Sequence, residues 1–277
     1  VFAMGFSALA RLVFRTGAIL VLLVSGAMAS ELVPHRAVYT MRLASSEGQG
    51  GLAGIRGAMV YEFKDVCDAW TADAKIYLLM QYARGREIET VRKSLTWESK
   101  DGKKFRFSVE ELRNKRISQQ ISGVAVLDGV GRGGMASYSK PRRMKVKLPA
   151  GTDFPSTHLA RLIRRSAAGK PILDKVLFDG SNLDNPYEVN AVIGQYRSDR
   201  RRVPGPLAAL GAASEPKKIW FARLAFFPFY SQAETSEFDM EVDYREDGII
   251  DRMVQDFGDY SMEMLMTEIA FPPREVC

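Results

Sequence analysis

Phe238-Asp239-Met240-Glu241-Val242-Asp243-Tyr244-Arg245 is the stretch of sequence that decides the fold class. Apolar and charged side chains alternate strictly through it. Because successive side chains of a strand point to opposite faces, this alternation predicts a strand with one apolar face and one solvated face. Burial on one face only is typical of antiparallel sheets, whereas parallel sheets are usually covered on both faces.

The same alternation recurs along the chain, for example over residues 36–43 and 104–109. Short turn-forming stretches separate such runs, as at Lys100–Lys103, Arg245–Gly248 and Phe257–Asp259. Roughly a dozen candidate strands result, most of them joined by short connections. The sequence therefore predicts an all-β domain with a meander-like antiparallel sheet.

One segment, at about residues 155–168, has helical periodicity instead. Pro155 suits the first turn, Asp153 or Ser156 is expected to cap the helix, and Gly169 is expected to end it. One face carries Leu159, Leu162, Ile163 and Ser166. We expect this helix to cover the end of a curved sheet or to fill its interior.

The first 29 residues have the pattern of an export signal. Two arginines precede an apolar run over 18–24, and Ala27-Met28-Ala29 offers the small residues that a signal peptidase reads. The apolar run is far shorter than the ~20 residues that span a bilayer. We expect cleavage before Ser30, a single periplasmic domain over residues 30–277, and no transmembrane segment after cleavage. A retained membrane anchor is the alternative.

The chain contains two cysteines, Cys67 and Cys277. In an oxidising export compartment, an even number of cysteines favours a disulfide. A bridge between these two would tie the last residue to an early part of the chain. Two buried, unreacted thiols are the alternative.

Charge is distributed unevenly along the chain. The net charge is +6, yet the stretch from Ser231 onward contains 13 acidic residues against 3 basic ones. Basic residues cluster at 140–147, 161–165 and 197–202. A basic surface favours anionic lipid headgroups, lipopolysaccharide or an acidic partner, and a solvated surface without a partner is the alternative. We expect no nucleic-acid partner, because no recognition motif is present.

No catalytic motif stands out. The two histidines, His35 and His158, each lack a second histidine or cysteine at metal-ligand spacing. The stretch from Gly129 to Gly134 has a G-x-G-x-x-G spacing, but a strand pattern rather than a helix follows it, which predicts a glycine-rich connection. We therefore expect a protein without enzymatic activity, metal or cofactor.

Two segments near the C-terminus have unusual apolar patterns. Residues 219–229 are largely apolar on both faces, and over 260–266 a tyrosine and three methionines share one face. Because thioether side chains adapt to varied shapes, such faces suit an apolar cavity for an acyl chain, with plain core as the alternative. The candidate cavity residues are Trp220, Phe226, Tyr260, Met262, Met264 and Met266, together with Leu159, Leu162 and Ile163 of the helix.

Five short stretches and the terminal cysteine, taken in their order along the chain, are characteristic of one protein family. The stretches are Leu32–Tyr39, Asp65–Trp70, Leu148–His158, Leu177–Gly180 and Tyr244–Gly248. In this order the chain resembles the cell-envelope integrity protein EipB family of Gram-negative α-proteobacteria. The resemblance implies a periplasmic protein whose many antiparallel strands form an open, spiral-like β-barrel, crossed by one α-helix and closed by one disulfide. The family is distantly similar to lipoprotein-carrier and lipocalin-like curved sheets.

The resemblance also implies a role in maintaining the envelope under stress. We expect a monomer that acts without catalysis, by binding an envelope protein, a lipid or another amphiphile. A periplasmic carrier of lipid or lipoprotein acyl chains is one alternative, and a hydrolase of peptidoglycan or glycan is another.

Overall fold

The computed structural model describes residues 32–47, 51–129, 131–194, 218–231, 234–273 and 277. In this part of the chain, all strands belong to one 15-stranded sheet, accompanied by a single α-helix. The expected signal peptide over residues 1–29 and the basic cluster at 197–202 lie outside the described residues. Over the ranges given above, no helix combines the length and apolarity that crossing a bilayer requires.

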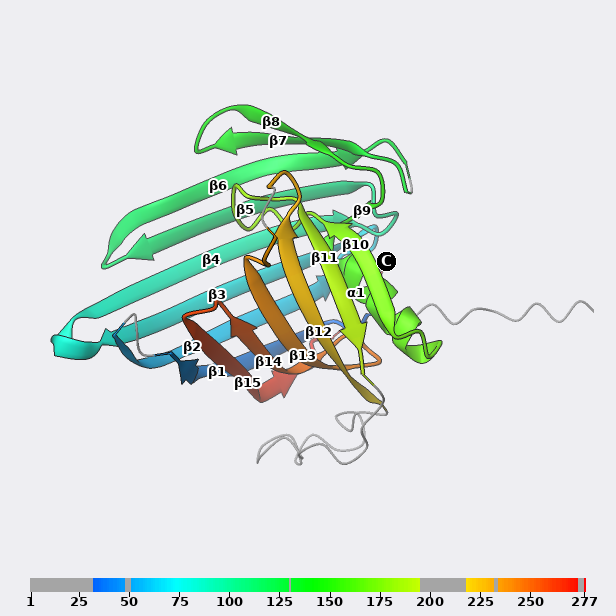
Figure 1. Cartoon of the computed structure of the whole chain (residues 1–277). Coiled ribbons are helices and arrows are strands. Elements are labelled where there is room, and N and C mark those ends of the chain that lie inside the picture. Colours follow the sequence, from blue (N-terminus) through cyan, green and yellow to red (C-terminus); the bar gives the residue numbers. More distant parts are fainter. Residues whose placement is uncertain (1–31, 48–50, 130, 195–217, 232–233, 274–276) are drawn as a thin grey trace, which may run out of the picture.

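The strands follow one another along the chain, and one α-helix lies between β9 and β10 (Figure 1). Their bounds are β1 His35–Ser46, β2 Leu52–Asp65, β3 Ala69–Tyr82, β4 Glu87–Ser99, β5 Lys104–Arg113, β6 Arg116–Leu127, β7 Gly134–Lys140, β8 Met144–Leu148, β9 Thr152–Asp153, β10 Ile172–Leu177, β11 Tyr187–Ile193, β12 Ile219–Pro228, β13 Phe238–Arg245, β14 Ile250–Asp256 and β15 Tyr260–Ala270. The helix α1 spans Pro155–Ala167, and a short 3-10 turn, Ala83–Gly85, joins β3 to β4.

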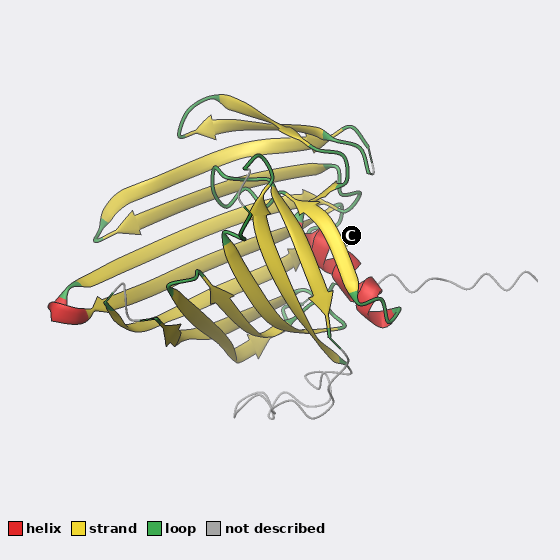
Figure 2. Ribbon diagram, in the orientation of Figure 1, coloured by secondary structure: helices red, strands yellow, loops and turns green. Residues whose placement is uncertain are grey.

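The sheet is a meander that curls back on itself, and it is antiparallel except where the short strand β9 pairs in parallel with β10. Its strand order is β8-β7-β6-β5-β4-β3-β2-β1-β15-β14-β13-β12-β11-β10-β9, so β8 and β9 lie at opposite ends of the sheet. Yet only residues 149–151 separate these two strands in sequence. The sheet must therefore wrap round until its ends adjoin, which gives the open, spiral-like barrel that was predicted (Figure 2).

Aromatic side chains join β5 to the segments that follow β9 and β10, the strands at the far end of the sheet. Phe105 of β5 stacks on Phe154, which precedes α1, with ring centroids 5.0 Å apart. Phe107 of β5 meets Phe178, which follows β10, edge to face at 5.4 Å. Gly180 has a φ of +63°, and a Cβ there would lie 2.4 Å from the Phe107 ring. Only glycine permits this close approach of the β10–β11 loop to β5.

Helix α1 covers one end of the barrel, as the sequence predicted. Thr157 approaches Gly102 in the β4–β5 turn, and Leu159 approaches Gly248 in the β13–β14 turn. Leu162 and Ile163 are buried in the core beneath β10–β13. The expected caps were wrong, because neither Asp153 nor Ser156 caps the helix through its side chain.

The cap comes from a distant strand instead. The carboxylate of Glu98, at the end of β4, accepts hydrogen bonds from the backbone N–H groups of Ser156 and Thr157 at 2.7 and 2.8 Å. The Thr157 hydroxyl donates a third bond at 2.6 Å. Asp153 pairs with Arg161 instead, with 2.7 Å between Oδ2 and Nε. A buried carboxylate thus satisfies the free N–H groups of the first helical turn.

The predicted disulfide is present between Cys67 and Cys277, with Cα atoms 5.6 Å apart. Cys67 lies in the turn between β2 and β3 rather than within a strand. It has a φ of +68°, and its N–H donates to the Asp65 side chain at 3.0 Å. The bridge therefore fixes the C-terminal residue to the barrel end that α1 covers.

Candidate functional site

The interior of the barrel contains a cavity of about 440 Å³. Strands β1–β5, β14 and β15 form its walls, with contributions from α1 and from two loops. This volume falls within the range of about 300–1,000 Å³ that is typical of small-molecule sites. The lining residues are His35, Tyr39, Met59, Tyr61, Ala72, Ala74, Arg92, Ser94, Thr96, Val109, Pro155, Leu159, Asp179, Ser181, Gly248, Ile250, Met253 and Met264.

Small side chains on two neighbouring strands leave this space empty. Ala72 and Ala74 of β3 alternate inward, and they pair across the ladder with Thr96 and Ser94 of β4. Farther along β3, the larger Ile76 and Leu78 pack against the core instead. Since interior space is normally filled by side chains, a local set of small ones opens a hollow at this level of the barrel.

Most of the cavity wall is apolar and flexible. Met59, Met253 and Met264 reach it from three different strands, and Leu159 reaches it from α1. Methionine side chains adjust their shape at low cost, so they tolerate ligands of varied shape. The wall therefore suits a hydrocarbon chain better than a rigid polar molecule.

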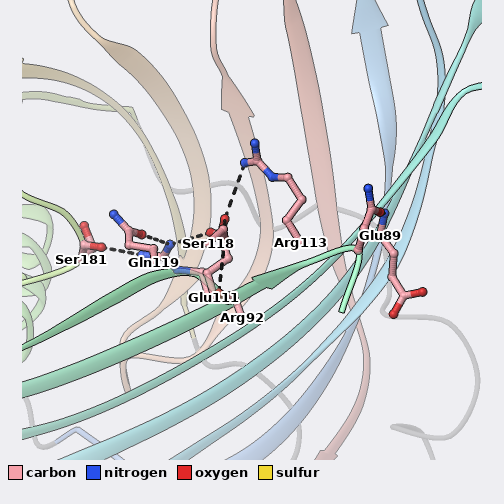
Figure 3. A network of polar contacts seen from close by, with 8 residues as sticks. Glu89, Arg92, Glu111, Arg113, Ser118, Gln119 and Ser181 are labelled. Atoms are coloured by element: carbon pink, nitrogen blue, oxygen red, sulfur yellow. Dashed lines mark hydrogen bonds and ion pairs between the residues drawn. The ribbon is translucent and has the colours of Figure 1, made fainter. Parts of the chain in front are cut away.

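Arg92 of β4 lines the cavity and lies at the centre of a network of polar contacts (Figure 3). The Arg92 guanidinium donates to Glu111 Oε2 at 3.0 Å, to Gln119 Oε1 at 3.3 Å, and to the carbonyl oxygen of Ser181 at 2.5 Å. Glu111 also accepts a bond from the Ser118 hydroxyl at 3.0 Å. Arg92 thus ties β4 to β5, β6 and the β10–β11 loop, and its charge is balanced by Glu111.

Burial changes the titration of three side chains that line the cavity. It raises the pKa of Tyr39 and of Tyr61 well above the usual tyrosine range. Burial also lowers the pKa of His35, whose Nδ1 lies 2.8 Å from the carbonyl oxygen of Val33. Near neutral pH, the two phenols are therefore protonated and the imidazole is uncharged, so these groups offer hydrogen bonds rather than charge.

The structure brings only part of the predicted cavity set to this hollow. Leu159 and Met264 line it. Leu162, Ile163, Trp220 and Phe226 belong to the packed core beneath β10–β13. Met262 and Met266 belong to the core around β1, β2 and β15, and Tyr260 packs against that core. On β12, the face that carries Trp220 and Phe226 is buried, whereas the opposite face is partly exposed.

Several lining residues were missed from the sequence, although a signal for them existed. Tyr39 stands on the apolar side of the alternating run over 36–43, and Tyr61 occupies the equivalent face of β2. The stronger signal is the pair of alternating small residues in β3, Ala72 and Ala74. Small residues at inward positions mark a level at which a barrel is not filled.

The two histidines occupy different environments. His35 lines the cavity, whereas His158 is buried in the first turn of α1 with neither ring nitrogen hydrogen-bonded. Within the described ranges, no three side chains of the His, Cys, Asp and Glu types form a group suited to a metal ion.

Comparisons with known proteins agree with this architecture. A family model described as EipB-like matches residues 26–273. The chain is 28% identical over 241 residues to a protein named cell envelope integrity protein EipB from Brucella abortus, with 86% of this chain and 84% of that protein covered. It also resembles a crystal structure from Brucella abortus described as a β-barrel-like protein of a domain of unknown function. The TM-score is 0.78 at 26% identity, covering 88% of this chain and 99% of that one.

Proposed function

This chain belongs to the EipB-like family, and from that membership we propose that it supports the cell envelope by holding an amphiphile in its interior cavity. The apolar tail lies against the methionine-rich wall, and the head group hydrogen-bonds at the side of Arg92. We further propose that the protein acts in the periplasm and without catalysis. The envelope role is taken from the name of the Brucella relative.

The cavity itself is the observation that carries this proposal. Its wall combines adaptable apolar side chains from three strands with a set of polar side chains on β4 and on the β10–β11 loop, which Arg92 joins through the Ser181 carbonyl oxygen. Amphiphiles have this same division between a long apolar part and a small polar part. A ligand of this kind gains from burial of its tail, at roughly 25 cal/mol per Å² of apolar surface removed from water.

Arg92 favours a head group that hydrogen-bonds over one that relies on charge alone. Its guanidinium is already balanced by Glu111, and Ser94, Thr96 and Ser181 add neutral polar groups nearby.

Filling the cavity tests the proposal. Ala74 points into the hollow, so Ala74→Phe places an aromatic ring where the tail would lie. Lys75→Phe adds the same ring one residue along β3, on the outer face, and is the matched control. Titration with dansyl-undecanoic acid should give saturable fluorescence enhancement with one site in the wild type and in Lys75→Phe. We expect affinity at least about tenfold weaker in Ala74→Phe, equivalent to about 1.4 kcal/mol.

Equal binding by all three proteins would place the probe outside the cavity. Where circular dichroism shows that each protein is folded, loss of binding in both variants would mean that a ring on the outer face matters as much as one in the cavity. Either result would then contradict the proposal.

A further inference from the structure

The outer face of β5–β8 carries a strip of exposed apolar side chains. Val124 and Val126 of β6 are each 43% exposed, and Met135 of β7 is 41% exposed. Val126 lies directly opposite Met135 in the ladder between these strands, and Val124 is two residues away on the same face. The three side chains therefore form one contiguous apolar strip, because residues of equal parity share a face of a sheet.

Cations flank this strip on both sides. On β5, Arg106 lies opposite Val124 and Lys104 lies opposite Val126. On β8, Lys147 lies opposite Met135, and Lys145 is two residues before it on the same face. These four cations are exposed, and none of them has an ion-pair partner in the portion of the chain that the structure describes.

Little negative charge offsets these cations within the same strands. Strands β5–β8 contain two acidic side chains, Glu110 and Glu111, both toward the far end of β5. Glu111 is engaged by Arg92, and Glu110 accepts a hydrogen bond from Gln120. The turn between β7 and β8 adds Arg142 and Arg143, both exposed. Beside this face, Arg106 stacks on the Trp97 ring, 4.8 Å from its centroid.

Lysines on an edge strand have an ordinary explanation, since they discourage pairing with other chains. That explanation covers Lys145 and Lys147, because β8 is at the end of the sheet. It does not cover Val124, Val126 and Met135, which lie on the face of the sheet and not at its free edge. Apolar side chains surrounded by cations are the pattern by which proteins rest on anionic lipid surfaces, with charge in the headgroup layer and apolar tips below it.

We propose that the outer face of β5–β8 docks the protein onto a membrane surface that contains anionic lipids. Lys104, Arg106, Lys145 and Lys147 contact the headgroups, and the apolar strip enters the boundary between headgroups and acyl chains. The strongly acidic stretch from Ser231 onward favours the orientation in which β5–β8 face the membrane. This docking is separate from the interior cavity and does not depend on the proposed amphiphile binding.

Sedimentation with lipid vesicles tests the docking. The wild type should bind vesicles of phosphatidylcholine mixed with phosphatidylglycerol, bind pure phosphatidylcholine vesicles much more weakly, and dissociate as salt is added. Lys145→Glu combined with Lys147→Glu should weaken binding at least about tenfold. Val126→Ser combined with Met135→Ser should also weaken vesicle binding, even at low salt, because the apolar strip no longer inserts.

The matched control reverses two exposed charges elsewhere, with Arg56→Glu combined with Lys170→Glu. The control should bind vesicles nearly as well as the wild type, although the change in net charge is the same. The proposal is overturned if the wild type does not bind anionic vesicles. That result is expected if this face binds an acidic protein or a second copy of the chain instead. It is also overturned if the control loses as much binding as the Lys145 and Lys147 variant. The Lys145 and Lys147 variant should still bind dansyl-undecanoic acid. This measurement separates a loss of membrane docking from a loss of ligand binding in the cavity.

Discussion

At the scale of single residues, the polar groups buried in the barrel are the least expected feature. Glu98, His35 and His158 are all buried, and sequence alone shows only that such residues exist. Glu98 and His35 have hydrogen-bond partners, whereas neither ring nitrogen of His158 has one. Burying an imidazole without partners is costly, so His158 is a point at which the fold gives up stability.

The His158 site makes stability depend on pH. Burial lowers its pKa to about 4, although the nearby Asp153 opposes the shift. In the unfolded chain, the ordinary histidine pKa of about 6.5 applies. As the pH falls from about 6.5 to 4, the unfolded chain takes up a proton that the folded protein does not, so the folded state loses stability. This histidine alone accounts for a loss of about 3 kcal/mol across that window.

His158→Leu removes this dependence while keeping a side chain of similar size. We expect the variant to be at least as stable as the wild type at pH 7 and to exceed it by about 3 kcal/mol more at pH 4. Urea unfolding at both pH values measures the two differences, and subtracting one from the other cancels the titration of other groups such as Glu98. A difference that stays constant with pH would mean that His158 takes up its proton in the folded protein as readily as in the unfolded chain.

At the scale of secondary-structure elements, features set by the local sequence were predicted, and features set by contacts with distant residues were not. Strand alternation and the bounds of α1 are local, and both were predicted closely, including the strand that follows the glycine-rich connection at Gly129–Gly134. The helix cap was missed because Glu98 stands 58 residues before Ser156. The local sequence does not predict a cap that is supplied by another element. The burial of Glu98 follows only from the closure of the sheet.

The Glu98 cap should contribute measurably to stability. Glu98→Ala leaves the N–H groups of Ser156 and Thr157 and the Thr157 hydroxyl without their acceptor, so we expect a loss of about 1–3 kcal/mol in urea unfolding. Glu98→Gln retains one acceptor oxygen and should lose less. Glu87→Ala, at the exposed opposite end of β4, is the control and should change stability by at most about 0.5 kcal/mol. If Glu98→Ala unfolds together with the control, the carboxylate is not the cap of α1.

At the scale of the whole molecule, the spiral sheet, its covering helix and the disulfide were predicted. The position of the cavity along the barrel was not. Met264 was chosen because strand alternation tells which side chains face inward, and Leu159 because it lies on the apolar face of the predicted helix. Which inward level remains unfilled depends on how Ala74 of β3, Ser94 of β4 and Met253 of β14 meet across the barrel. The sheet must close before those sizes can be compared.

The Cys67–Cys277 bridge should stabilise the barrel against unfolding. It joins residues 210 apart, for which the loop-entropy account gives a stabilisation of at most about 5 kcal/mol. Cys67→Ser, Cys277→Ser and the reduced wild type should therefore all unfold at lower urea concentrations than the oxidised protein. Their β-sheet content, measured by circular dichroism, should be unchanged. Unfolding curves that coincide with that of the oxidised wild type would show that the bridge adds no stability.

Native mass spectrometry of the protein, isolated from cell envelopes without added lipid, tests the central claim most directly. If the barrel holds an amphiphile, the wild type should carry one small molecule per chain that is released on denaturation, and Ala74→Phe should carry much less. If the wild type has the mass of the bare chain and carries no more ligand than Ala74→Phe, the claim that the cavity is a binding site is contradicted.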